Sequence, residues 1–378
     1  MKMKSLLLGS AAALATVSAA QAADAIIAAE PEPMEYVRVC DAFGTGYFYI
    51  PGTETCLKIG GYVRIQIDGR SDADIDGLGK VQDGGYMTKT RGQLVIDAKS
   101  DTEFGTLASK ITLRANNNSN GNSDFYLEDT YIELGGFRIG QFYNYFDIGV
   151  PGETVLADGG PIAGFGGIGG VRDGLGLGTD GYMAGDTLNN SVRYTFDNGT
   201  FQAYIQGDAF NSEAGWKYDD DIEDTADEVG INGLIAGKFG GVAIDLFGAY
   251  EFDNEDGVLA STLTAEIGPG SLGVFGVYSF GPSRYWDFSE WSIGAEYAIK
   301  VTDKFTIAPG AQYWDKILPV DGDYEGGTAW RVGVTADYEV TENLAVKATV
   351  NYTDVDIDML GVGDGDHWDG FFRLQRSF

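Results

Sequence analysis

Hydrophobic and polar side chains alternate along the segment 57–68. The apolar side chains occupy odd positions: Leu57, Ile59, Val63, Ile65 and Ile67. The polar side chains occupy even positions: Lys58, Arg64, Gln66 and Asp68. Successive side chains of an extended chain point to opposite faces, so this period of two predicts a β-strand with one apolar and one polar face.

The same alternation recurs to the C-terminus and predicts sixteen strands. Besides 57–68, they are 86–100, 103–115, 124–134, 136–142, 189–197, 199–209, 228–240, 241–252, 257–268, 270–280, 288–300, 303–316, 326–340, 342–353 and 366–378. The alternation breaks within 124–134, where Asp129 and Glu133 share a face with Phe125 and Leu127. We interpret that break as a hint of a subunit contact.

The connections between the predicted strands differ in length in a regular way. Tight turns, at 135–136, 197–199, 240–241, 269–270 and 341–342, alternate with longer polar loops. Strands that run towards the long loops end in aromatic residues: Tyr250, Phe252, Tyr278, Phe280, Tyr313 and Tyr352. Returning strands also end in aromatic residues: Tyr297, Tyr338 and Phe378. Short turns on one side, long loops on the other and two aromatic girdles are typical of a transmembrane β-barrel.

A soluble β-sandwich or propeller is the alternative, because its strands also alternate apolar and polar positions. Here the polar faces carry more Arg, Lys, Gln and Asp than a dry core can hold, which favours a wet interior and a lipid-facing exterior. The composition agrees, with 56 Gly, 9 Pro and 13% aromatic residues. We therefore predict an all-β fold, a sixteen-stranded antiparallel transmembrane barrel over 57–378.

The segment 143–188 is rich in Gly and Asp and shows no helix or strand pattern. An irregular stretch this long in a compact protein is usually functional or disordered. We interpret it as the third long outer loop, folded into the barrel, where it narrows the interior.

The N-terminus predicts export. Lys2 and Lys4, an apolar run over 6–17 and the small residues around Ala22 fit a signal peptide over 1–22. No other segment has the eighteen apolar residues of a membrane helix. An exported segment over 23–56 follows, expected in the periplasm, in which Cys40 and Cys56 can form a disulfide.

The charge balance limits the partners. Removal of Lys2 and Lys4 leaves 23 basic against 57 acidic residues, a net charge of about −34. This charge makes nucleic acid an unsuitable partner. The acidic runs in loops are expected to be solvated and to bind divalent ions at most loosely beside lipopolysaccharide.

Motifs for catalysis, cofactors or metals are weak. His367 is the single histidine, and no nucleophile elbow or zinc-binding helix motif is present. A glycine pattern at 164–169 lacks the βαβ unit that binds a dinucleotide. Asp72 to Asp83 resembles a calcium loop but lacks its terminal Glu and flanking helices. We predict no enzyme, cofactor or metal site; a hydrolase that uses His367 is the alternative.

Three parts of the chain resemble the general porins of rhizobia and related alphaproteobacteria. They are the signal segment 1–22, the run 35–64 around the two cysteines, and the ending Gly-Phe-Phe-Arg-Leu-Gln-Arg-Ser-Phe at 370–378. The resemblance implies an outer-membrane homotrimer of sixteen-stranded barrels that pass small hydrophilic solutes, with the third loop in each lumen. It also implies that Phe378 is the signal read by the barrel-assembly machinery.

A channel of this kind selects solutes by the size of its narrowest gap and by the charges that line it. The acidic candidates lie in the central loop: Glu153, Asp158, Asp173, Asp180 and Asp186. The basic candidates lie on polar strand faces: Arg64, Arg91, Arg114, Arg138, Arg193, Arg331 and Arg373. We hypothesise a transverse field between the loop acids and the wall arginines.

General passive diffusion of ions and small solutes is the predicted function. A substrate-specific channel would need a ladder of lumen aromatics, for which Trp314 and Tyr204 are the candidates. A surface structural or adhesion protein with a barrel as anchor is the alternative from another class.

Overall fold

Sixteen long strands, each paired antiparallel with its neighbours, form a closed ring in the computed structural model. The structure describes residues 38–119, 121, 123–161, 187–210, 229–320, 322–359 and 362–378. The strands of the ring are β2 (Cys56–Arg70), β5 (Gly85–Thr102), β6 (Gly105–Asn118), β7 (Ser123–Leu134), β8 (Phe137–Tyr143), β9 (Leu188–Asp197), β10 (Phe201–Ala209), β11 (Val229–Phe239), β12 (Val242–Glu251), β13 (Asp256–Ile267), β14 (Gly270–Ser279), β15 (Trp291–Thr302), β16 (Phe305–Asp315), β19 (Thr328–Thr341), β20 (Leu344–Met359) and β21 (Val362–Ser377). The sixteen predicted strands are confirmed, although several of their ends differ by a few residues.

The ring closes where the last strand pairs with the first. β21 and β2 are antiparallel neighbours, from Ser377 opposite Tyr62 to Asp369 opposite Arg70. At the end of this seam, Gly61 and Phe378 exchange two backbone hydrogen bonds of 3.1 and 3.0 Å. The candidate assembly signal Phe378 thus completes the seam, and its side chain is exposed.

The outer face of the ring is apolar, as the alternation predicts. Ile65 is 49% exposed, whereas its neighbours Gln66 and Asp68 are buried on the inner side. Exposed aromatic residues form rows at both ends, and one row runs from strand to strand through Trp330, Tyr352 and Trp368, whose tilted rings have centroids 5.3 and 4.9 Å apart. An apolar band between aromatic rows is the exterior expected of a barrel in a lipid bilayer.

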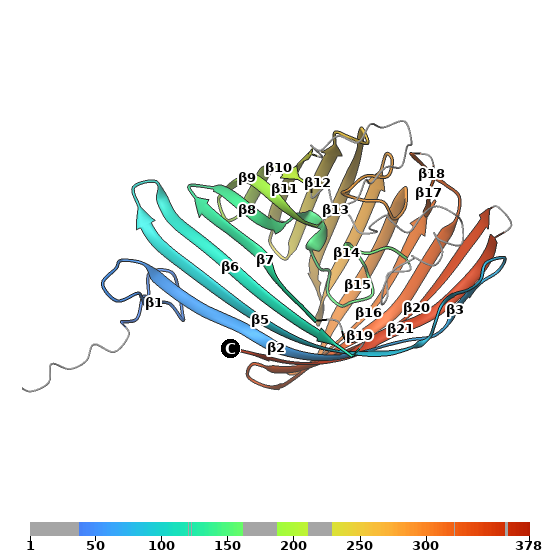
Figure 1. Cartoon of the computed structure of the whole chain (residues 1–378), viewed down its shortest axis with the longest axis horizontal. Helices are drawn as coiled ribbons and strands as arrows, with labels where there is room; N and C mark the ends of the chain where they lie inside the picture. The colour runs from blue at the N-terminus through green and yellow to red at the C-terminus, as the bar shows by residue number, and fades with distance from the viewer. Residues whose placement is uncertain are drawn as a thin grey trace, which may run out of the picture. The chain divides into compact units, whose positions relative to one another are not determined.

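Short turns and long connections lie at opposite ends of the strands. The Gly135-Gly136 turn between β7 and β8 has positive φ at both residues, which favours glycine and suits a two-residue hairpin. The long connections carry the short strands β3 (Ala73–Ile75), β4 (Gly79–Gln82), β17 (Leu318–Val320) and β18 (Asp323–Glu325). Figure 1 shows β3, β17 and β18 on the side opposite the first short strand, β1 (Phe48–Tyr49).

The broken alternation in 124–134 has a local cause. The pairing of β6 with β7 shifts register between Ile111 and Leu113, so one residue of β6 faces two of β7, Glu128 and Asp129. This is a β-bulge, which resets which face each side chain occupies. Phe125 and Leu127 are exposed outside, while Glu128 is buried. The hint of a subunit contact therefore has a sufficient explanation within the sheet.

The predicted disulfide joins Cys40 to Cys56, with Cα atoms 5.9 Å apart. It encloses the segment before β2, where β1 pairs with the start of β2. Both cysteines are buried with Tyr47 in a small cluster of their own. Within the described residues, no helix is long and apolar enough to cross a membrane. The predicted signal peptide, 1–22, lies outside the described residues.

Leu246 and Asp245 allow a direct test of the two faces of the wall. Leu246, in the middle of β12, is 54% exposed on the outer face, and Asp245 points to the inner face with the buried Phe247. We expect Leu246→Arg to lower the free energy of unfolding by about 2–4 kcal/mol, because the arginine must enter the lipid. Asp245→Arg places the same side chain in the interior and is the control. Urea titration of both variants in lipid vesicles, followed by tryptophan fluorescence, measures the difference; equal losses would contradict the assignment of faces.

Candidate functional site

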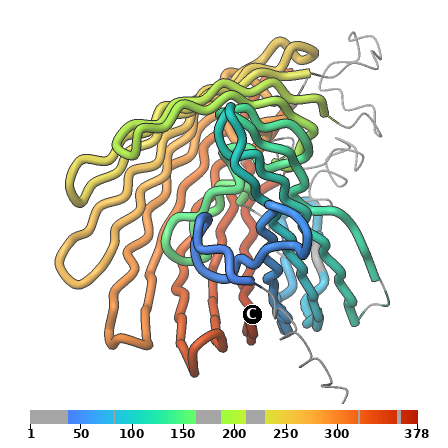
Figure 2. Tube along the Cα trace, turned by 90° about the vertical axis from the view of Figure 1, so that its left-hand side faces the viewer, coloured from blue at the N-terminus to red at the C-terminus, as the bar shows by residue number. Residues whose placement is uncertain are grey.

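The chain folds into the ring directly after β8. Residues 144–161, here called the inward segment, begin with the single helical turn η1 (Tyr145–Asp147). The Tyr145 hydroxyl donates to Thr262 Oγ1 of β13 at 2.7 Å, and Phe146 packs on Phe247 with centroids 5.2 Å apart. Burial raises the pKa of Tyr145, so the hydroxyl stays protonated and can donate. In Figure 2, which faces the short-turn end, the segment is seen in light green within the ring of strands.

Wall side chains fix the inward segment by hydrogen bonds to its backbone. The acceptors come from β19, β15 and β16: Glu153 N–H donates to Thr335 Oγ1 at 3.0 Å, Thr154 N–H to Glu296 Oε1 at 2.6 Å, and Leu156 N–H to Gln312 Oε1 at 2.6 Å. Gln312 Nε2 also donates to the Leu156 carbonyl at 3.1 Å. An irregular backbone away from bulk water needs such partners, so the wall determines the path of this segment.

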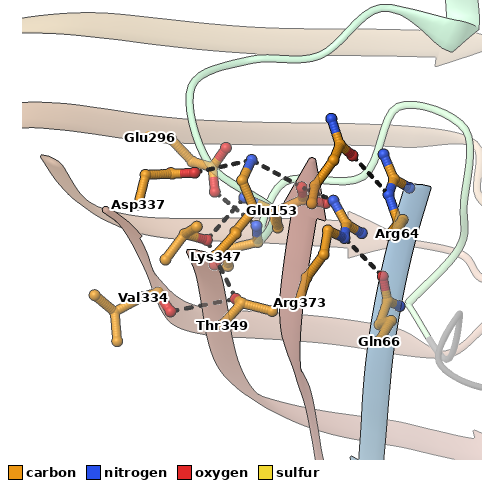
Figure 3. Close-up of polar contacts among 12 residues, drawn as sticks. Arg64, Gln66, Glu153, Glu296, Val334, Asp337, Lys347, Thr349 and Arg373 are labelled. Carbon is orange, nitrogen blue, oxygen red and sulfur yellow. Dashed lines mark hydrogen bonds and ion pairs between the residues drawn. The ribbon is translucent and has the colours of Figure 1, made fainter. Parts of the chain in front are cut away.

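Glu153 of the inward segment forms ion pairs with the wall (Figure 3). Its Oε1 accepts from Lys347 Nζ at 3.0 Å and lies 3.3 Å from Arg373 NH1. Lys347 also reaches Asp337 at 3.4 Å, and Arg373 Nε donates to Gln66 at 2.6 Å. One loop carboxylate therefore meets two wall cations, on β20 and β21.

Those two cations belong to a longer row that crosses five neighbouring strands. We call it the cationic ladder: Lys347 (β20), Arg373 (β21), Arg64 (β2), Arg91 (β5) and Arg114 (β6). Lys347 lies directly opposite Arg373 in the pairing of β20 with β21, and Arg64 lies directly opposite Arg91 in the pairing of β2 with β5. Such like-charged neighbours repel each other, so the ladder is an electrostatically costly feature of the wall.

Amide side chains separate the arginines of the ladder. Arg64 Nε donates to Gln375 at 2.9 Å, Arg91 Nε to Asn116 at 2.7 Å, and Arg114 NH2 to Gln93 at 2.8 Å. Arg114 also pairs with the buried Glu128. Among the residues that the structure describes, no carboxylate lies within 4.0 Å of Arg64 or Arg91. Among the described residues, the hydrogen-bond partners of these two guanidinium groups are therefore neutral amides and not carboxylates.

Arg331 is placed differently from the ladder. It is buried and forms a two-point ion pair with Asp369, with distances of 2.7 and 2.8 Å, and also donates to Thr353. His367 Nε2 lies 3.7 Å from the same carboxylate. The carboxylate of Asp369 largely cancels the charge of Arg331, so Arg331 contributes little to the electric field in the lumen. Its ion pair instead links β19 to β21.

Arg138 and Arg193 form a second basic group on β8 and β9. They lie directly opposite each other, and each stacks on a tyrosine ring 4.2 Å away, Arg138 on Tyr131 and Arg193 on Tyr204. Arg138 pairs with Glu133 at 2.6 Å. Both arginines line a cavity of about 630 Å³ beside the Gly135-Gly136 turn. The structure thus divides the predicted arginines into three groups: those of the cationic ladder, the ion-paired Arg331, and the pair Arg138 and Arg193.

The predicted acids fall into two groups. Glu153 reaches the ladder, and Asp158 is exposed further along the inward segment. Asp173, Asp180 and Asp186 lie outside the described residues.

Two carboxylates of the acidic loop at 72–83 are paired with a lysine. In the segment that resembles a calcium loop, Asp72 and Asp83 pair with Lys80 at 2.8 and 2.9 Å, and the pKa of Asp72 is lowered by its bond to that lysine. Within the described ranges, no group of three or more His, Cys, Asp or Glu residues is placed to hold a metal ion.

Comparison with known proteins places these features in a family. The sequence matches the porin subfamily over residues 24–166 and 167–369. The chain belongs to this porin family.

The porin has relatives along its full length. It is 40% identical to outer membrane protein IIIA of Rhizobium leguminosarum bv. viciae over 94% of this chain and 90% of that protein. It is 34% identical to the porin Omp2b of Brucella neotomae over all of both chains. Such relatives and the lipid-facing ring assign the porin to the bacterial outer membrane, and its family and fold are those of a channel.

Two solved structures share the fold of the porin at low identity. The anion-selective porin from Comamonas acidovorans superposes with a TM-score of 0.60, at 14% identity over 86% of this chain and 100% of that one. A trimer form of OmpT from Vibrio cholerae superposes with a TM-score of 0.55, at 13% identity over the same shares of the two chains.

Sequence reasoning missed several residues of the porin's site. Lys347, Glu296 and Gln312 touch the inward segment directly, yet none was among the candidates. All three stand on polar faces of predicted strands, which is a signal for the interior. The alternation of polar and apolar positions does not show which interior side chain lies at the same level along the barrel axis as the inward segment.

Glu296 offers a test of how the porin holds its inward segment. We expect Glu296→Ala to leave the buried N–H of Thr154 without an acceptor, at a local cost of about 1–3 kcal/mol. The segment should then move, which would appear as greater current noise in the open state and faster proteolysis within 150–160. Glu266→Ala, at an exposed position on β13, is the control. Noise and proteolysis equal to the control would show that Glu296 does not hold the segment.

Proposed function

We propose that this porin is a general diffusion channel in which ions and small hydrophilic solutes pass between the inward segment and the cationic ladder. The observation that carries the proposal is the contact of Glu153 with Lys347 and Arg373, because it places a loop carboxylate against one end of a row of wall cations. In this proposal, solutes cross the channel by passive diffusion. The width of the gap and the charges that line it select which solutes pass.

Electrostatics supports a role for the ladder in selectivity. Two unit charges about 4 Å apart interact by about 4 kcal/mol at an effective dielectric constant of about 20. Arg64 and Arg91, whose described partners are neutral amides, therefore attract anions in a narrow gap. Screening over about 8 Å at physiological salt reduces the effect of acids far out on the loops. The sign of selectivity thus depends on charges at the gap and not on the net charge of the chain.

The arrangement of aromatic residues favours general diffusion over a substrate-specific channel. Trp314 is fully buried, and Phe247 and Phe275 on the same side of the interior are buried too. Tyr204 lies under Arg193. These rings pack against protein and do not form an open track along which a solute could slide.

We further propose that the porin is a homotrimer, with lipopolysaccharide around its outer loops and with Phe378 read by the barrel-assembly machinery. The trimer form of a solved structure that shares the fold supports the oligomeric state. The exposed position of Phe378 at the seam supports its accessibility at the end of the last strand.

Neutralising each side of the gap should shift selectivity in opposite directions. Arg64→Gln with Arg91→Gln removes two cations, so the cation-to-anion permeability ratio should rise by a factor of about three. Glu153→Gln removes the loop acid, so the ratio should fall. Reversal potentials in planar bilayers with unequal KCl measure both changes. Arg376→Gln, on the outward-facing side of β21, is the control, and unchanged ratios in both site variants would contradict the proposal.

Shortening the loop should widen the channel. We expect a deletion inside 150–180 to increase the conductance of each step, because the gap between loop and wall then disappears. Steps in groups of three would support the trimer. A folded wild-type barrel that conducts no ions would instead favour an anchor for a surface protein.

A further inference from the structure

The segment 281–289, here called the 281–289 loop, connects β14 to β15 and is buried at every residue. Connecting segments normally run over the surface, because water satisfies their backbone groups there. This one starts at the long-loop end, yet its Trp286 packs against Phe275 in the middle of β14, with centroids 6.2 Å apart. The loop therefore descends into the ring.

Hydrogen bonds hold one side of the 281–289 loop to the wall. The Tyr285 hydroxyl donates to Asp208 Oδ2 of β10 at 2.6 Å, and the Arg284 backbone N–H donates to Glu251 of β12 at 2.5 Å. Asp208 is buried and accepts further bonds from Gln206 and Asn232. Burial and the Asp208 carboxylate raise the pKa of Tyr285, so the hydroxyl remains a donor.

Aromatic packing joins the other side of this loop to the inward segment. Trp286 packs against Phe146 with centroids 5.4 Å apart, and the Trp286 ring meets Phe288 edge-on at 4.9 Å. Phe288 lies so close to Gly160 that a Cβ there would come within 2.6 Å of its ring. The 281–289 loop thus contacts the inward segment near both of its described ends.

Behind these contacts lies a cluster of buried apolar side chains. Phe247, Phe275 and Trp314, on the inner faces of β12, β14 and β16, belong to one buried apolar cluster with Phe146, Val155, Tyr285, Trp286 and Phe288. The cationic ladder stands on the other strands, β20, β21, β2, β5 and β6. The interior therefore has an apolar, packed side and a polar side.

We propose that the 281–289 loop is a second constriction element of this porin. It clamps the inward segment and keeps solutes out of the side of the lumen lined by β12–β16, so that they pass along the cationic ladder. This inference rests on the proposed diffusion function, because it assumes that solutes cross the ring.

Trp286→Ala tests the clamp, with Tyr285→Phe as a milder variant that loses only the hydrogen bond to Asp208. We expect Trp286→Ala to raise single-channel conductance by about twofold, because conductance follows the open cross-section, and to admit larger sugars in liposome swelling. Tyr285→Phe should raise open-state noise.

Phe280→Ala is the matched control, since Phe280 borders the same loop but is 59% exposed outside. Replacement of 282–288 by two glycines, which should widen the channel further, tests the clamp if Trp286→Ala does not fold.

Two outcomes separate this inference from the proposed function. Folded variants whose conductance, noise and sugar cut-off all match those of Phe280→Ala would overturn the clamp alone, provided that the ladder and Glu153 variants still shift selectivity. If the wild-type barrel conducts nothing, the diffusion function fails, and the clamp fails with it.

Discussion

The structure depends on one constraint: every backbone N–H and C=O group within a lipid bilayer needs a hydrogen-bond partner inside the protein. An open sheet would leave two unpaired edges, so the sixteen strands must close. The closing seam is the pairing of β21 with β2, completed by the two bonds between Gly61 and Phe378. Closure gives all strands an inner and an outer face, and both the lipid-facing surface and the lumen follow from it.

Charged side chains on the inner face of the ring have two kinds of partner. Arg331 meets Asp369 in a buried pair, whereas Arg64 and Arg91 have amide partners and keep their charge available. A buried arginine without a carboxylate would be strongly unfavourable in a dry core. The half-buried charges of the ladder therefore require water beside them, which agrees with the proposed passage along β20, β21, β2, β5 and β6.

The opposite side of the interior is built like the core of a soluble protein. Phe146 from the inward segment and Trp286 from the 281–289 loop pack on inner-face aromatics, and Glu296, Gln312 and Asp208 accept hydrogen bonds from the two segments. Two loops that meet both each other and the wall can hold a fixed gap, which a single free loop cannot. Such rigidity matters for a size filter, because a gap that fluctuates loses its cut-off.

Sequence alone determined the wall. A period of two is a local property, so Trp330 outside and Arg331 inside followed from their order in the chain, as did sixteen strands, the turns and the disulfide. The tertiary structure decided the rest. The bulge at Glu128 and Asp129, the pairing of Arg331 with Asp369 and the meeting of Glu153 with Lys347 and Arg373 join residues whose proximity depends on strand register and loop path. Alternation says that a side chain faces inwards, but neither its depth nor its partner across the lumen, because closure of the ring brings together residues that are far apart in the sequence.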